Sequence, residues 1–253
     1  AFSGGISIEQ NGELYPSATG ELSLVAAQSV DLYDSSGSDS LLYSNYFGMI
    51  DASTSALPSP TNQMPTSING VTNEFLGDLN SNGPIAHSQN ALHAGDTQPV
   101  LIYSLTGSII DGVLGSDGNY NNLLQIDVDK PAEIEAGQNI VNLAFLGQNL
   151  RDDDLTSVIA GRDISDSKNF DYANNFVAPA LVIGGPGTFL VQAGRNSGPL
   201  VNQQEIYDRE GAAYNDPTTG IDAVGNADDP FLPHESANVQ VLFGVGPGID
   251  ASA

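Results

Sequence analysis

The sequence predicts an all-β protein in which short strands stack into a parallel β-helix. Three observations support this prediction. A short phrase of apolar and turn-forming residues recurs along the chain, as it does in solenoid proteins. The 253 residues include 28 Gly and 14 Pro, a density of turn residues that suits many short strands. No stretch repeats apolar residues at i, i+3, i+4 and i+7, so no amphipathic helix is expected.

The recurring phrase consists of an apolar residue, any residue, Ala, Gly, Gln or Arg, Asn or Asp, and a second apolar residue. It is best preserved at Ile134–Ile140 and Val158–Ile164, with a degenerate copy at Phe145–Leu150. Partial copies occupy residues 24–30, 92–96 and 191–196. In a β-helix the Gly supplies the unusual backbone angles of a corner, and Asn or Asp bonds to neighbouring backbone. We therefore predict that Ala27, Gly95, Gly137, Gly161 and Gly194 occupy equivalent corners.

The chain begins with paired strands and returns to strands after a long interruption. Over residues 1–32, Leu22, Leu24 and Ala26 share one face and should point inward, because alternate residues of a strand share a face. Residues 34–90 are rich in Ser, Asp, Pro and Asn, which predicts a first long insertion. Strands are expected again at 100–105 and at 124–128, where a polar outer face alternates with the apolar one.

The second half of the chain is likewise predicted to consist of short strands interrupted by loops and one long insertion. After the phrase region, a polar loop is expected at 165–178 and strands at 180–183 and 189–193. The glycine-rich segment 184–187 lacks the Lys-Ser/Thr of a phosphate-binding loop and is predicted to be a turn. Residues 197–237 form the second predicted insertion, and 239–245 a last alternating strand. We expect one β-helix domain over residues 1–253, cut from a longer protein.

The charge of the chain is strongly negative. Six Lys and Arg residues face 31 Asp and Glu residues, so the net charge is −25, and no Lys or Arg precedes Lys130. Such a surface repels nucleic acids and anionic lipids, which excludes both as partners. No apolar run reaches the roughly 18 residues of a membrane span, so membrane insertion is not expected. The acidity is explained by solubility, or else by binding of a divalent cation or a cationic partner.

Calcium is the one metal for which the sequence offers candidates. Asp152, Asp153 and Asp154 are consecutive, and Asp127 and Asp129 share one face of a predicted strand. Calcium needs six or more oxygen ligands from several segments, and consecutive side chains on a strand diverge. The run is therefore explained equally by a solvated turn. The three His residues lack the spacing of zinc ligands, and no cofactor is expected.

Two further features bear on ligand binding. Tyr43, Tyr46 and Phe47 lie in an aromatic patch that could stack on sugar rings or pack the insertion against the body of the protein. Arg151 with Asp153 could serve a polysaccharide-cleaving β-helix. The chain has no Gly-x-Ser-x-Gly motif, so a hydrolase nucleophile has no support in the sequence. We expect no enzymatic activity.

The amino-acid sequence of the second half resembles a known family. The segments AEIEAGQNIVNLAFLGQNLRDDDLTSVIAGRDI, IGGPGTFLVQAGRN and TTGIDAVGNADDPFLPHESANVQVLFGVG are similar to a C-terminal region of the filamentous haemagglutinin-like exoproteins of two-partner secretion. The resemblance covers roughly residues 91–250. It implies a right-handed parallel β-helix, export through an outer-membrane transporter, and display at or release from a Gram-negative cell surface. The family supplies no catalytic residues that would transfer to this chain.

Three classes of function remain open after the sequence is read. The first is a structural or adhesive module of a secreted surface exoprotein, active in cell adhesion, aggregation or biofilm formation, with a cell surface, glycan or matrix as partner. The second is a β-helix that binds or cleaves carbohydrate. The third is an extracellular protein that assembles end to end through open rungs.

Overall fold

The computed structural model describes an all-β chain built on three parallel sheets. The described residues are 3–10, 12–14, 17–33, 35, 46–49, 90–116, 118, 120–167, 179–200, 206–207, 213–214, 220–225 and 231–245. Within them no residue is helical, so this part of the chain holds no helix that could cross a bilayer. The prediction of an all-β protein with parallel strands is confirmed.

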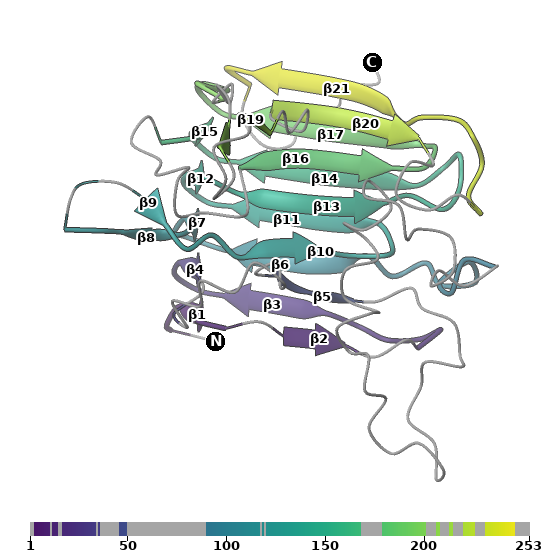
Figure 1. Ribbon diagram of the computed structural model, residues 1–253, viewed down its shortest axis with the longest axis horizontal. Helices are drawn as coiled ribbons and strands as arrows, with labels where there is room; N and C mark the ends of the chain where they lie inside the picture. The colour runs from purple at the N-terminus through teal and green to yellow at the C-terminus, as the bar shows by residue number, and fades with distance from the viewer. Residues whose placement is uncertain are drawn as a thin grey trace, which may run out of the picture.

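Each sheet is a ladder of strands from distant parts of the sequence (Figure 1). Sheet A contains β1 (Ile6–Ile8), β4 (Val30–Leu32), β7 (Ile109–Asp111), β12 (Ile140–Val141) and β15 (Ile164–Ser165). Sheet B contains β2 (Gly12–Leu14), β5 (Tyr46–Met49), β10 (Gln125–Asp127), β13 (Ala144–Gln148), β16 (Ala180–Gly184) and β20 (Gly220–Gly225). Sheet C contains β3 (Ser23–Ala26), β6 (Val100–Ser104), β11 (Ala132–Ala136), β14 (Leu155–Ala160), β17 (Thr188–Ala193) and β21 (Asn238–Phe243).

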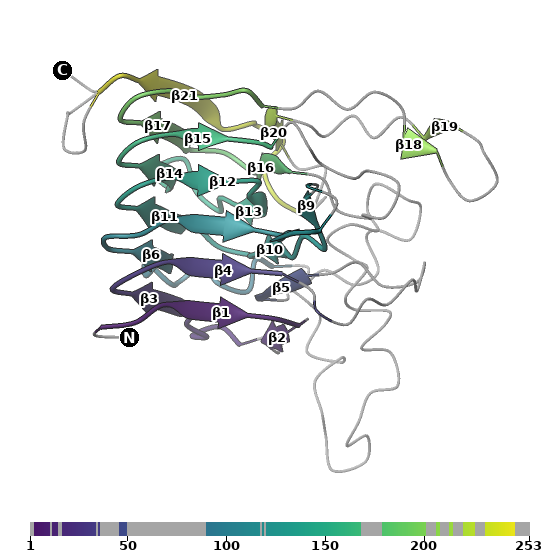
Figure 2. The same cartoon turned by 90° about the vertical axis from the view of Figure 1, so that its left-hand side faces the viewer.

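The chain passes through the sheets in a fixed cyclic order. It runs from A to B to C and then begins again at A, one strand further along each ladder (Figure 2). We call one such passage a rung. Two short antiparallel pairs interrupt this order: β8 (Val113–Leu114) with β9 (Tyr120–Asn121), and β18 (Ile206–Tyr207) with β19 (Ala213–Tyr214). The order places rungs that are close in sequence next to one another in space.

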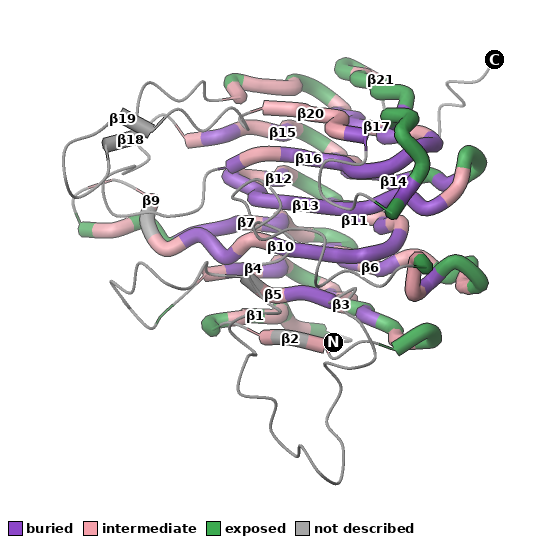
Figure 3. The backbone as a smooth tube through the Cα atoms, turned by 45° about the vertical axis from the view of Figure 1, so that its right-hand side comes forward, coloured by how far each residue is buried: buried purple, intermediate pink, exposed green. Residues whose placement is uncertain are grey.

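The apolar core is built from buried residues of all three sheets, and the buried parts of the chain are purple in Figure 3. By strand register, its residues form columns that run from strand to strand. In sheet C one column joins Leu24, Ile102, Ile134, Val158, Val191 and Val241 through successive strand pairs. In sheet B another joins Phe47, Ile126, Phe145, Leu181 and Ile221. Burying like side chains above one another removes a continuous apolar surface from water, which is the main stabilising contribution in such a stack.

The recurring phrase forms the corner between sheet C and sheet A, and three of its glycines stack there. A Cβ on Gly161 would lie 2.4 Å from the carbonyl oxygen of Gly137, and one on Gly194 would lie 2.2 Å from that of Gly161. Glycine is required because neighbouring backbones approach too closely for any side chain. The equivalence of Gly137, Gly161 and Gly194 is therefore confirmed.

Two of the predicted copies of the phrase are wrong. Gly95 lies in a turn before β6, and the corner of that rung follows Ser104, which pairs with Ala136. That corner is one residue longer than its neighbours, because Ile109 pairs with Ile140. The degenerate copy at Phe145–Leu150 belongs to sheet B instead, where Phe145 packs against Phe189 in the core with ring centroids 6.4 Å apart.

Both predicted insertions contain a strand of sheet B. The range 34–90 includes β5, and the range 197–237 includes β20. Ser197 also forms a parallel bridge with Ile164, so it occupies the sheet A position of the last rung. In both ranges the turn residues outnumber the residues of the strand, so local composition concealed β5 and β20.

Candidate functional site

A polar cavity lies at the corner between sheets B and C and spans three rungs. Its volume is about 260 Å³. It is bordered by the segments that lead into β6, β11 and β14, and we call it the corner cavity. Its lining residues are Asp96, Thr97, Gln98, Pro99, Pro131, Glu133, Arg151, Asp153, Asp154 and Leu155. The volume is slightly below the ~300–1,000 Å³ of small-molecule sites, so the cavity suits one small polar unit.

Two members of the Asp run, Asp153 and Asp154, line the cavity, and the three members differ in role. Asp154 is buried; its Oδ2 accepts hydrogen bonds from the backbone N–H of Leu150 at 2.8 Å and of Arg151 at 2.9 Å. Its Oδ1 accepts from Nε and Nη2 of Arg151, at 3.0 and 2.7 Å. Asp152 and Asp153 are exposed. Asp154 is therefore a turn-capping residue with its oxygens engaged by the chain itself.

Arg151 joins the Asp run to the segment before β6. Its Nη1 donates to the carbonyl oxygens of Asp96 at 3.1 Å and of Ala94 at 3.4 Å. Together with the bonds to Asp154, these contacts engage Nε and both terminal nitrogens of the guanidinium. The planar fork of Arg is well suited to such multiple contacts. Arg151 thus holds the wall of the cavity in place and has little donor capacity left for a ligand.

A group of charges, most of them buried, adjoins the cavity through Asp96. Nζ of Lys130, only 1% exposed, donates to Asp96 Oδ2 at 2.7 Å and to the carbonyl oxygen of Gly20 at 3.0 Å. Glu21 Oε2 lies 3.5 Å from the same Nζ. The ring of His93 lies between two carboxylates, with Nδ1 3.3 Å from Asp96 and Nε2 3.5 Å from Asp129. The group connects residues from three different rungs.

These contacts alter the ionisation of the groups around the cavity. Burial by itself raises the pKa of Asp96, but the hydrogen bonds from Lys130 and from the backbone of Gln98 outweigh it and lower the pKa to about 2. Burial and a hydrogen bond to Glu133 raise the pKa of Tyr103. Asp96 is therefore a carboxylate at every physiological pH, and the Tyr103 hydroxyl orients Glu133 at the cavity.

The structure does not bring the calcium candidates together. Asp127 and Asp129 belong to the sheet B side and are buried, whereas Asp152 and Asp153 are exposed at the corner. Asp127 accepts a hydrogen bond from Gln125 at 2.5 Å, and burial raises its pKa to about 7. The predicted alternation at 124–128 is confirmed, because Leu124, Ile126 and Val128 belong to the core and Gln125 and Asp127 lie on the opposite side, but Asp127 on that side is buried. Within the described ranges, no group of three or more acidic or His side chains is placed to hold a metal.

The structure places two of the three aromatic candidates for sugar binding, Phe47 and Tyr46. Phe47 is partly buried against the core, directly beside Gly12 of the preceding rung, so it packs the sheet B column and is not free to stack on a sugar. Tyr46 lies in β5 and pairs with Gln125 through the backbone. Tyr43 lies outside the described residues.

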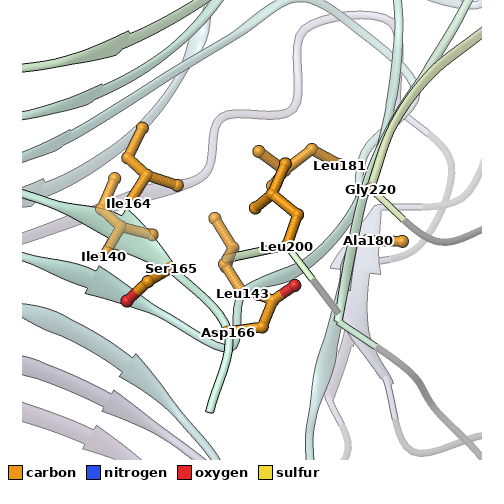
Figure 4. A pocket seen from close by; sticks show the side chains of 9 residues that line it. All are labelled: Ile140, Leu143, Ile164, Ser165, Asp166, Ala180, Leu181, Leu200 and Gly220. Atoms are coloured by element: carbon orange, nitrogen blue, oxygen red, sulfur yellow. The ribbon is translucent and has the colours of Figure 1, made fainter. Parts of the chain in front are cut away.

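A second cavity lies where sheets A and B approach each other near the last rungs (Figure 4). Side chains of Ile140, Leu143, Ile164, Leu181 and Leu200 surround it, with Asp166 at one side. Its volume is about 10 Å³, roughly that of a single water probe. It is a packing gap at a corner and is too small for a ligand.

Sequence reasoning missed Asp96, Lys130, Glu133 and Tyr103, and it did not connect His93 with them. One signal was available: Lys130 is the first Lys or Arg in a chain of net charge −25. A lone cation that follows a strand in so acidic a chain is expected to have carboxylate partners. Which carboxylates it meets depends on the stacking of rungs and could not be read from local sequence.

Comparison of the chain with models of known families, with curated proteins and with solved structures finds no match. The class that fold and site define is thus an all-β protein of three parallel sheets with a polar cavity at one corner.

Proposed function

We propose that the chain is a right-handed parallel β-helix that serves as a structural or adhesive module of a secreted bacterial exoprotein. The observation that supports this most is the cyclic A–B–C order of parallel strands, with apolar residues in column. Quasi-one-dimensional stacks of this kind provide long, rigid surfaces that need neither disulfides nor cofactors. The chain has no Cys, in agreement with such a scaffold.

The proposed setting is the outside of a Gram-negative cell. The phrase at Ile134–Ile140 and Val158–Ile164, which carries the resemblance to filamentous haemagglutinin-like exoproteins, occupies stacked corners of adjacent rungs. A net charge of −25 suits an exposed, soluble surface and disfavours nucleic acid as a partner. The partner we propose is a cell surface, glycan or matrix.

We propose binding in preference to catalysis. The arrangement of Arg151 supports this choice, because the guanidinium is engaged by Asp154 and by two backbone carbonyls. A cleaving enzyme would need that cation directed at substrate. Carbohydrate binding at the corner cavity is the second candidate function. It is supported by the carboxylates of Glu133 and Asp153 and the amide of Gln98, groups that accept and donate hydrogen bonds to hydroxyls.

A bead assay tests the adhesive role. Beads coated with the chain are washed over Gram-negative and epithelial cells at fixed shear, and retained beads are counted. We expect retention well above that of beads coated with an unrelated protein of similar negative charge. Retention no higher than that of these control beads, on either cell type, would contradict the adhesive proposal.

A paired substitution tests the corner cavity. Glu133 and Glu135 both lie on the outer face of β11, but only Glu133 lines the cavity. On a glycan array, Glu133→Gln should reduce binding about 10-fold or more, since a hydrogen bond to a charged group contributes about 1.5–3 kcal/mol. Glu135→Gln removes the same charge and should change little. Equal effects of both would assign binding to general charge and reject the cavity.

A further inference from the structure

The end of the stack at β21 exposes residues that belong to the core. By strand register, Val239, Val241 and Phe243 continue the inward columns of Phe189, Val191 and Ala193, which are all fully buried. The three residues are nevertheless 43%, 42% and 69% exposed. In the part of the chain that the structure describes, β21 pairs only with β17, so the other edge of this six-residue strand is open. Open apolar edges of this length are sites of strand addition.

The opposite end of the stack has the same cross-section. Strands β1, β2 and β3 each terminate their sheets and have one strand partner among the described residues. Ile6, Ile8, Leu14 and Leu24 of these strands are core-facing yet only partly buried. The two ends lie at opposite poles of the molecule, the purple and yellow ends in Figure 1. The end formed by β1–β3 therefore exposes one apolar surface, which we call the lower end, and the end at β21 exposes another, the upper end. Within each sheet the strands at the two ends run in the same direction.

We propose that these two ends dock on each other between copies of the chain, head to tail, so that the stack of rungs continues from one molecule into the next. The proposal rests on the β-helix of the proposed function. The contact needed already exists five times within the molecule, between consecutive strands of sheet C. Leu24 at the lower end and Val241 at the upper end are members of one column. Placing Leu24 over Val241 repeats that interface in register.

The geometry favours head-to-tail over face-to-face contact. Two copies meeting through their β21 ends would be related by a two-fold axis and would pair β21 antiparallel, against the parallel register of every other strand pair in the three sheets. A head-to-tail contact keeps the strands parallel and leaves a free end after each addition. Heterologous contacts of this kind build open series of copies.

Charge sets the conditions under which the contact forms. Each copy carries a net charge of −25, so two copies repel at low ionic strength. The Debye length falls from ~10 Å at 0.1 M salt to ~3 Å at 1 M, which screens this repulsion while the apolar contact persists. We therefore expect association to increase with both protein concentration and salt.

Light scattering coupled to size-exclusion chromatography tests the proposal on a matched pair of variants. Val241→Asp places a charge in the exposed end surface, whereas Gln240→Asp adds the same charge to the neighbouring, outward-facing residue of β21. In 1 M salt the unaltered chain and Gln240→Asp should pass through dimer to larger species as concentration rises. Val241→Asp should remain a monomer. Added to the unaltered chain at a tenth of its concentration, Val241→Asp should still shorten the assemblies, because its lower end is intact.

Three outcomes overturn the proposal: a monomer under all conditions, a series that ends at a dimer, and equal assembly by Val241→Asp and Gln240→Asp. Circular dichroism and the melting temperature of each variant show whether the fold is retained. Bead adhesion by the monomeric Val241→Asp variant separates the two ideas. Adhesion by that monomeric variant would show that the adhesive role does not depend on assembly. Adhesion of the unaltered chain without its assembly would reject only the docking surface, and its assembly without adhesion would reject only the proposed function.

Discussion

At the scale of single residues, the core of this protein contains carboxyl groups where apolar side chains are expected. Asp111 pairs with Leu32 in sheet A and is fully buried. Its oxygens accept hydrogen bonds from the backbone N–H of Leu124 at 2.8 Å and of Ala144 at 3.1 Å. Burial raises the pKa of Asp111, and these hydrogen bonds counteract the rise. One side chain thus ties the start of β10 and the start of β13 to β7.

Removal of the Asp111 carboxyl should destabilise the fold strongly. Asp111→Ala leaves two buried N–H groups without their acceptor, at a cost of about 1–3 kcal/mol each. Asp111→Asn retains one acceptor oxygen and should lose about half as much. Urea denaturation followed by circular dichroism gives the free energies of unfolding. A loss under 1 kcal/mol for Asp111→Ala would contradict the bridging role.

Asp127 makes stability depend on pH in a predictable direction. Its pKa rises from 3.8 to about 7 on folding, so the folded state holds the proton more tightly. The resulting stabilisation is fully present below pH 3.8 and is lost as the pH rises toward 7. Each pKa unit corresponds to about 1.4 kcal/mol.

The variant Asp127→Asn isolates this contribution. Between pH 4 and pH 7, the free energy of unfolding of the unaltered chain should fall relative to that of Asp127→Asn, by up to a few kcal/mol. Asp152→Asn, which removes an exposed carboxyl, is the matched control and should track the unaltered chain. Parallel pH profiles for all three proteins would show that Asp127 does not titrate as inferred.

At the scale of elements, the corner between sheets C and A tolerates no side chain at its stacked glycines. Gly161→Ala would direct a methyl group at the backbone carbonyl of Gly137, 2.4 Å away, and that backbone cannot move without disturbing the next rung. We expect a loss of about 1–3 kcal/mol, typical of overpacking. Gly95→Ala has no atom within 4 Å and should be neutral. Thermal melts of the two variants compare a stacked glycine with one that only resembles it in sequence.

Side-chain ladders reinforce the same corner. Asp163 accepts hydrogen bonds from Arg195 and from Asn196, and its backbone N–H donates to Asn139 at 3.3 Å. The hydrogen bond from Arg195 lowers the pKa of Asp163, so this carboxyl stays ionised. The polar residues of the phrase are therefore used between rungs, in agreement with the structural role that the sequence pattern predicted for them.

At the scale of the whole molecule, the excess of 25 negative charges should make stability depend on salt. Screening reduces self-repulsion, so added NaCl should raise the melting temperature. Calcium and magnesium chloride at equal ionic strength should act alike, because Asp154 is engaged by Arg151 and the other candidate carboxylates lie apart. A larger rise with calcium alone would indicate a calcium site.

The sequence by itself determined the class of the fold and the chemistry of its corners. The phrase around Gly137 and Gly161 is local: a tight bend, a small residue and a polar cap are requirements of a few consecutive residues, so they appear as a pattern. The same locality explains the errors. Gly95 and the segment Phe145–Leu150 match the pattern but lie elsewhere in the rung, and β5 and β20 each lie within a long range that is dominated by turn residues.

Only the tertiary structure decided which polar groups meet. Gly20, Asp96 and Lys130 are far apart in sequence, and they make contact because the strands after each of them stack in one sheet. The same stacking buries Asp127, engages Asp154 with Arg151, and leaves Val241 exposed at an open end. Strand register is a long-range property, and one rung more or less between two residues changes every neighbour they have. For that reason the cavity and the end surface could not be predicted from the local pattern that revealed the rungs.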